Sequence, residues 1–119
     1  MEFNSNKPIY LQIYDLICER VLGGNYSEEE RIPSVREFGA EIGVNPNTVM
    51  RSYEKLTGRG IIYNKRGIGY FISHDAKRLI LESHKVEFIT DELPALIRKM
   101  RLLGVSLEEF EAIWSNSNE

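Results

Sequence analysis

The sequence has little cysteine and no long hydrophobic run, and each shortage excludes a class of protein. A single cysteine, Cys18, allows no intramolecular disulfide and no cysteine-rich zinc site. No apolar stretch approaches the roughly 18 residues that a membrane span needs. The first residues also lack the basic and then apolar order of a signal peptide. We therefore expect a cytoplasmic protein, with one domain and at most a small appendage in 119 residues.

Side chains that would support catalysis are also scarce. His74 and His84 are the only histidines, and His84 with Glu87 gives just two potential metal ligands at helical spacing. The Gly67-Ile68-Gly69 stretch lacks the Lys-Ser/Thr pair that follows a phosphate-binding loop. Cys18 lies in an apolar helical pattern, as expected of a small buried residue. We expect no enzyme, no catalytic residues, no metal site and no cofactor.

Positive charge is concentrated in one part of an acidic chain. The formal net charge is −3, yet residues 31–66 hold seven basic and only three acidic residues, which leaves −7 on the remainder. Local charge rather than net charge steers a polyanion to a protein. The pattern predicts one surface that faces an anion, although a solvated charged face is the simpler alternative.

Two helices are indicated by the first 43 residues. Apolar residues recur at helical spacing over 8–22, with Pro8 suited to the first turn. A polar connection over 25–33 follows. A second helix begins at Ser34, because Ser followed three residues later by Glu37 fits a capping box. Gly43 suits the position just past its end.

A third helix follows after two residues. Asn45 is a good N-cap and Pro46 a good first residue, and we expect the helix to end at Gly58 or Gly60. Two helices separated only by Gly43-Val44 are typical of a helix-turn-helix, although any helical hairpin has a similar pattern.

Two short strands complete the first part of the chain. Residues 61–64 and 70–72 are rich in β-branched and aromatic side chains, and residues 65–69 between them form the tip of a hairpin. A helix-turn-helix followed by a basic hairpin is a winged helix, and the two features together favour DNA binding over a plain helical hairpin.

The third helix carries side chains that can read base edges. Asn47, Thr48 and Arg51 lie in its first turns, where arginine can bind guanine and asparagine can bind adenine. Asn45 and Pro46 begin this helix, whose free backbone N–H groups suit a phosphate. As an alternative, Arg51 pairs with Glu54 on a solvated face.

Further cations flank the third helix. Arg36 begins the preceding helix and can reach a phosphate or a base, unless it pairs with Glu37 or Glu41. Lys65 and Arg66 at the wing tip suit a minor groove, beside Gly67.

The last 45 residues have a different pattern. Apolar residues recur every seven positions over 75–103, which predicts a helical seam for a second copy of the chain. Pro94 should kink or split this helix, and a short helix follows from Ser106. As an alternative, the seam packs on the first helix of the same chain. The predicted dimerisation residues are Leu79, Val86, Ile89, Leu93, Leu96 and Met100.

Several stretches together carry a family resemblance. They are Pro-Ser-Val-Arg-Glu-Phe at 33–38, Gly-Val-Asn-Pro-Asn-Thr-Val at 43–49 and Gly-Ile-Gly-Tyr-Phe-Ile at 67–72. With them, residues 8–72 resemble the winged-helix domain of GntR-type bacterial transcription regulators. The tail over 92–104 is similar to the YtrA-like subfamily, whose members lack a large ligand-binding domain, dimerise through C-terminal helices and often control ABC transporter genes.

The resemblance implies a particular set of DNA contacts. Carried over by position, they fall on Arg36, Asn45, Asn47, Thr48, Arg51, Arg66 and Gly67. The helix starts and the wing add Ser34, Pro46 and Lys65. Many relatives have arginine where this chain has Pro46 and Met50, so base recognition by those arginines is absent here. The three carboxylates at 28–30 depart from the family's glycine-containing turn, and we expect them to point away from DNA.

The expected fold class is α+β, mostly α. A winged helix-turn-helix DNA-binding domain at 1–73 is followed by a short helical dimerisation segment at 74–119. The expected function is a homodimeric repressor that reads an inverted-repeat DNA operator, of transporter genes and of its own operon. The expected partners are double-stranded DNA and a second copy, with no membrane. The alternatives are a winged-helix module that binds protein and a small-ligand sensor.

Overall fold

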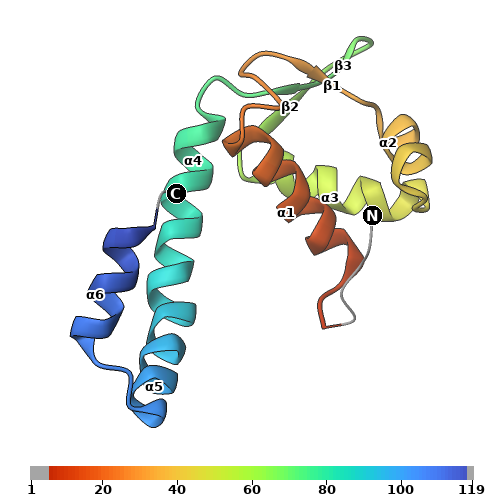
Figure 1. The fold of residues 1–119 in the computed structure, drawn as a ribbon. Coiled ribbons are helices and arrows are strands. Elements are labelled where there is room, and N and C mark those ends of the chain that lie inside the picture. The colour runs from red at the N-terminus through yellow and green to blue at the C-terminus, as the bar shows by residue number, and fades with distance from the viewer. Residues whose placement is uncertain (1–5, 118–119) are drawn as a thin grey trace. The chain divides into compact units, whose positions relative to one another are not determined.

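A computed structural model describes residues 6–117, and the chain divides into two compact units between Glu82 and Ser83. The first unit contains α1 (Ile9–Leu22), β1 (Arg31–Ile32), α2 (Val35–Ile42), α3 (Pro46–Gly58), β2 (Ile62–Lys65), β3 (Gly69–Ile72) and the start of α4 (Ala76–Glu87) (Figure 1). The second contains the end of α4, a π-helical turn η1 (Phe88–Glu92), α5 (Leu93–Leu103) and α6 (Leu107–Asn116). The expected mixed, mostly helical fold class is confirmed.

The core of the first unit forms around α3. Both α1 and α2 pack against α3, and one face of α3 is buried, including Tyr53 and Leu56. Ser52 is buried with them and donates a hydrogen bond to the Tyr10 carbonyl at 2.6 Å, so its hydroxyl is satisfied. These contacts fix the position of α3 and leave its opposite face to solvent. Fully buried side chains from the other elements are Ile13, Ile17, Phe38, Ile72 and Ile80.

The turn between α2 and α3 is tight because of two glycines. Gly43 ends α2 in the left-handed conformation (φ 72°), which an L side chain rarely adopts. A Cβ atom added at Gly39 would lie 2.6 Å from the Val44 carbonyl oxygen, closer than any real contact of this kind. The two helices of the helix-turn-helix therefore approach each other backbone to backbone.

A small antiparallel sheet has the strand order β1-β3-β2. Strands β2 and β3 pair with Tyr63 opposite Phe71, and these two rings stack at 5.7 Å between centroids. The sequence analysis missed β1, which pairs Arg31 with Phe71. It has two residues and forms only because β3 offers a free edge, so no local pattern marks it.

The first unit extends past the predicted boundary at 73/74. Ala76 and Ile80 on α4 are fully buried in the same core as α1 and α3, so this unit continues through Glu82. The start of the predicted tail helix thus belongs structurally to the winged helix.

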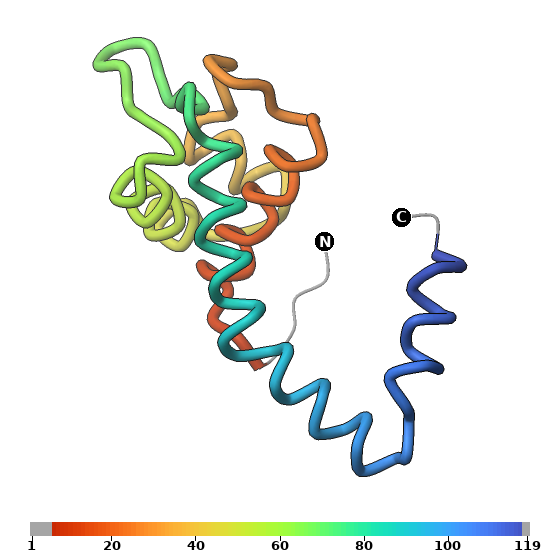
Figure 2. The backbone as a smooth tube through the Cα atoms, turned by 90° about the vertical axis from the view of Figure 1, so that its left-hand side faces the viewer, coloured from red at the N-terminus to blue at the C-terminus, as the bar shows by residue number. Residues whose placement is uncertain are grey.

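The second unit is helical, and its helices begin and end where local signals predict. The π-helical turn over Phe88–Glu92 lies just before Pro94, which occupies the first turn of α5, where a missing N–H is tolerated. Gly104 ends α5, and Ser106 forms a capping box with Glu109 at the start of α6. Figure 2 shows the chain reversing direction between α5 and α6.

Candidate nucleic-acid interface

The start of α2 is fixed by a complete capping box. The Ser34 hydroxyl oxygen accepts from the Glu37 N–H at 3.1 Å, and the Glu37 carboxylate accepts from the Ser34 N–H at 2.9 Å. The hydrogen bond from the Ser34 backbone N–H to the carboxylate is the main cause that lowers the pKa of Glu37, with a further contribution from the Ser34 side chain, and it keeps Glu37 ionised. The predicted cap is confirmed, and it orients Arg36 in the first turn.

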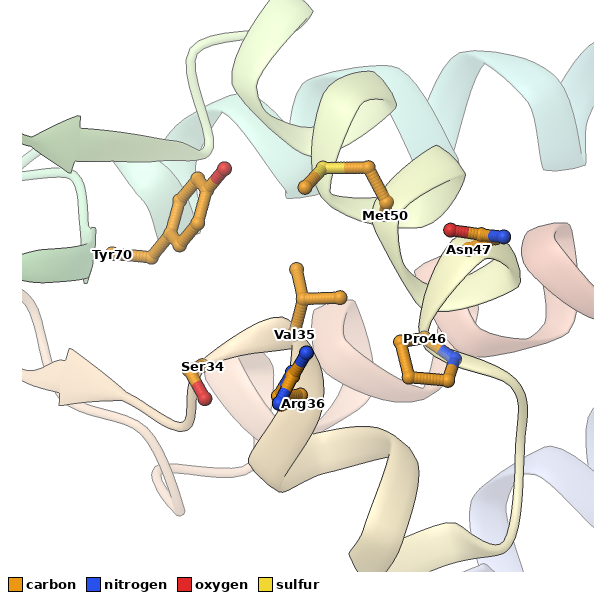
Figure 3. Close-up of a pocket in the computed structure, with 7 residues that line it drawn as sticks. All are labelled: Ser34, Val35, Arg36, Pro46, Asn47, Met50 and Tyr70. Atoms are coloured by element: carbon orange, nitrogen blue, oxygen red, sulfur yellow. The ribbon is translucent and has the colours of Figure 1, made fainter.

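Arg36 is exposed and free of the carboxylates that were considered as its partners. Glu37 is taken by the cap, and Glu41 lies 4.0 Å from Arg20. Arg36 forms no ion pair with any residue over 6–117, so the alternative in which it pairs with Glu37 or Glu41 is wrong. Its guanidinium faces outward beside α3 (Figure 3).

The first turn of α3 is capped by Asn45. Its side-chain oxygen accepts from the Asn47 N–H at 2.8 Å, and Pro46 occupies the first helical position, as predicted. Asn45, Pro46 and Asn47 are exposed, whereas Thr48 is half-buried. The positive end of the helix dipole and polar side chains thus share one exposed turn, an arrangement suited to an anionic ligand.

Cations farther along α3 lie over tyrosine rings of α1. The Arg51 guanidinium lies 4.0 Å from the Tyr10 ring centre, instead of pairing with Glu54 as the alternative had it. Lys55 and Arg59 lie 4.9 and 5.6 Å from the ring of Tyr14. Sequence reasoning missed these tyrosines, because only the crossing of α1 and α3 brings them under the cations. Their rings hold a basic ridge in place along α3.

The wing tip lies between β2 and β3. Lys65, Arg66 and Gly67 are all exposed there, and the Ile68 N–H donates to the Lys65 carbonyl at 2.8 Å. Arg31 from β1 donates to the Ile68 carbonyl at 3.2 Å. Arg31 therefore stabilises the wing from the neighbouring strand β1, a role that its place in a predicted polar connection did not indicate.

The carboxylates of residues 28–30 lie at the other end of the sheet. The Glu29 N–H donates to the Ile72 carbonyl, at the end of β3 opposite the tip. The Glu29 carboxylate accepts from the Tyr63 hydroxyl at 2.6 Å, and Glu28 lies 3.5 Å from His74. The contacts of Glu28 and Glu29 thus keep their negative charge away from the wing tip.

A shallow depression of about 500 Å³ lies between the starts of α2 and α3 and strand β3. Arg36 and Asn47 are at its rim, whereas Val35 and Met50 form apolar walls (Figure 3). The depression brings together residues predicted to bind DNA from both helices of the helix-turn-helix.

The predicted dimerisation residues differ in exposure. Leu79 is half-buried, and its side chain lies near Gly60 within the first unit. Leu93 and Met100 are half-buried, whereas three others are exposed. Those three are Val86, Ile89 and Leu96. Further exposed apolar residues of the second unit are Phe88, Ile97, Leu102, Leu103, Leu107, Ile113 and Trp114.

Groups suited to other chemistry do not come together in the part of the chain that the structure describes. No three His, Cys, Asp or Glu side chains over 6–117 are placed to hold a metal ion. Cys18 is buried, and burial raises its pKa to about 12, so its thiol is a poor nucleophile. Among the described helices, none is long and apolar enough to cross a membrane.

A helix-turn-helix with a capped, exposed second helix and a basic wing defines a winged-helix DNA-binding protein. Residues 9–72 match the sequence model of a protein family, the bacterial regulatory proteins of the gntR family. The chain belongs to the GntR family, and it is a DNA-binding transcription regulator rather than an enzyme.

Individual proteins show the same relationship. The HTH-type transcriptional repressor YtrA of Bacillus subtilis (strain 168) is 40% identical over 105 residues, which cover 88% of this chain and 80% of YtrA. The structure of a GntR family transcriptional regulator from Listeria monocytogenes has a TM-score of 0.78 and 33% identity, and the match covers 98% of this chain and 100% of that one. The DNA-binding domain of AraR, solved in complex with operator ORR3, has a TM-score of 0.55 and 26% identity over 61% of this chain and 86% of its own.

Proposed function

We propose that the protein is a homodimeric repressor that acts in the cytoplasm and reads an inverted-repeat operator. The observation that carries the proposal is the hollow that Arg36 and Asn47 line at the starts of α2 and α3, together with the exposed cations of the wing tip. Arg36 and Arg66 form no ion pair with any described residue, so both are available to a DNA anion or base edge. The repressor YtrA and the operator complex of AraR, both similar to this chain, support this reading.

Each element has a proposed part in binding DNA. The first turns of α3 enter the major groove, where Asn47, Thr48 and Arg51 contact bases, with Arg36 reaching across from α2. The N-terminal turns of the two helices bind the phosphate backbone, through Ser34 at the start of α2 and through Asn45 and Pro46 at the start of α3. In the wing, Lys65, Arg66 and Gly67 follow the minor groove.

The first experiment is selection of binding sites from a random duplex library, followed by anisotropy titration of the selected DNA. The protein's own upstream DNA and neighbouring transporter genes are the natural genomic targets to test next. Specific binding should resist unrelated competitor DNA. Equal, weak binding to all sequences that falls steeply with salt would reject a sequence-specific regulator and favour the protein-binding or ligand-sensing alternatives.

Arg36→Ala should weaken binding to the selected DNA roughly 5- to 150-fold if the guanidinium reaches a base. The matched control is Arg78→Ala on α4, because Arg78 is already paired with Asp75 and Glu82 outside this surface. Equal losses in the two variants would contradict the role of Arg36.

The wing predicts a different signature. Lys65→Ala or Arg66→Ala should weaken binding to all sequences and reduce the slope of log affinity against log salt by about one. Lys77→Ala, an exposed cation of α4, should leave the slope unchanged. A wing variant with an unchanged slope would show that the wing does not contact phosphates.

The dimer part of the proposal depends on the apolar seam over the second unit. Ile89→Asp with Leu96→Asp should give a monomer by sedimentation equilibrium and bind one half-site weakly, since both residues are exposed apolar groups. Leu81→Asp, at an exposed apolar position off the seam, should remain dimeric. A seam variant that stays dimeric would move the interface elsewhere, to the region of Phe110 and Trp114.

A further inference from the structure

The depression at the centre of the proposed DNA-binding surface is apolar where polar side chains would be expected. Met50 and Pro46 are four residues apart on α3, so they lie on the same face of the helix. Val35 contributes from α2 and Tyr70 from β3 (Figure 3). Three elements therefore build one apolar hollow of about 500 Å³ on the exposed side of the helix-turn-helix.

Packing of the protein itself does not account for Met50. Its side chain is 38% exposed and lies outside the buried core, which α3 forms with its other face through Val49, Tyr53 and Leu56. An exposed, flexible thioether gains contact area only when another surface covers it. The methionine thus lies on the face of α3 that the protein's own core leaves uncovered.

The polar rim limits what that partner can be. Arg36 and Asn47 flank the hollow, and both side chains are suited to the hydrogen-bonding edges of bases. A ligand that fits must offer hydrogen-bonding groups and, next to them, a small apolar group. In the major groove, thymine is the base that presents such a group, the 5-methyl.

We propose that Met50, with Val35 and Pro46, receives the 5-methyl group of a thymine in each operator half-site and makes the protein select thymine there. The inference rests on the proposed function, because it requires α3 to lie in the major groove. The hollow is already formed by fixed backbone elements, so the methyl group displaces water from an existing apolar surface. Arg36 and Asn47 then contact the neighbouring bases and hold the thymine in register.

The test removes only the methyl group. In the DNA obtained by selection, each thymine is replaced in turn by uracil, which keeps every hydrogen-bonding group. One thymine position in each half-site should matter. Uracil at that position in one half-site should weaken binding by the wild-type protein about four-fold, the effect of losing one buried methyl group. Uracil at that position in both half-sites should weaken binding about 15-fold.

The variant Met50→Ala should discriminate less than the wild type between thymine and uracil DNA at that position, because only Val35 and Pro46 remain to contact the methyl group. Leu81→Ala, which shortens an exposed apolar side chain on α4, should retain the wild-type preference. Because Met50 is exposed and alanine favours a helix, Met50→Ala should keep the wild-type urea midpoint, which is measured to verify folding.

The outcomes separate the two proposals. If selection yields no specific DNA, the proposed function fails. If specific DNA is obtained but no uracil substitution weakens binding, or if Met50→Ala keeps the full wild-type preference, the thymine contact is refuted while the regulator remains. Displacement of DNA by a small molecule that protects Met50 from oxidation would assign the hollow to an effector and also overturn the thymine contact.

Discussion

Tyr53→Phe removes one hydroxyl from the centre of the winged helix. The Tyr53 side chain is fully buried, and its hydroxyl donates to the Pro33 carbonyl at 2.6 Å. The ring also packs edge-on against Tyr70, with centroids 4.9 Å apart, and phenylalanine keeps that contact. Loss of the hydrogen bond leaves a carbonyl without its partner, so the free energy of unfolding should fall by about 1–3 kcal/mol.

The Tyr53 hydrogen bond also links the two helices of the helix-turn-helix. Pro33 directly precedes the capping residue Ser34 of α2, so the Tyr53 hydroxyl ties α3 to the start of α2. With a urea slope on the order of 1–3 kcal/mol per molar, the unfolding midpoint should fall by about 1 M. Circular dichroism at a single protein concentration measures this midpoint, since dimerisation would otherwise shift it.

Tyr63→Phe is the matched control for Tyr53→Phe. The Tyr63 hydroxyl also donates a 2.6 Å hydrogen bond, to Glu29, but this bond is exposed and water can replace it. Its midpoint should stay close to that of the wild type. Equal shifts in the two variants would refute the argument that burial makes the Tyr53 hydrogen bond important.

Three further predictions concern the same unit. Cys18 is buried and burial raises its pKa to about 12, so iodoacetamide at pH 8 should label it only after urea unfolding; rapid native labelling would contradict its position. Burial also raises the pKa of Tyr14 to about 12. The folded state thus holds these two protons more tightly, so their contribution to stability should be constant below about pH 8 and fall as pH rises toward 12, measured as urea midpoints, whereas a flat profile over that range would exclude this linkage. Gly39→Ala should lower the free energy of unfolding by about 1–3 kcal/mol, because the added Cβ would lie 2.6 Å from the Val44 carbonyl oxygen. Gly58→Ala is the control and should cost nothing, because its Cβ would have no neighbour within 4 Å. Equal urea midpoints for the two variants would refute the close approach at Gly39.

Local signals in the sequence were sufficient for the helix starts. Ser34 and Asn45 were predicted as caps and Ser106 as the start of a helix, and each makes capping hydrogen bonds, because a cap depends only on residues within one turn. The winged-helix order followed from these starts and from the two β-rich stretches. The capping box of Ser34 and Glu37 also indicates that the Glu37 carboxylate is not available to Arg36, because the box already uses it.

Contacts between distant segments were not predictable in this way. Strand β1 exists only because β3 is beside it, and the stacking of Arg51 on Tyr10 joins residues 41 positions apart. The continuation of the core into α4 depends on Ala76 and Ile80, which a seven-residue pattern groups with the tail. In each case the deciding partner lies on another element, so single-element patterns do not contain the information.

Tyr10 and Tyr14 of α1, which lie under the cations of α3, add positions at which mutation should alter regulation. A guanidinium that rests on the Tyr10 ring has lost part of its rotational freedom before DNA arrives, which reduces the entropy that binding must remove. Replacing Tyr10 would return that freedom to Arg51 without altering the cation itself. For the proposed repressor, mutations that relieve repression should therefore arise in α1 as well as in α3, and they would weaken operator binding while every side chain proposed to contact DNA is still present.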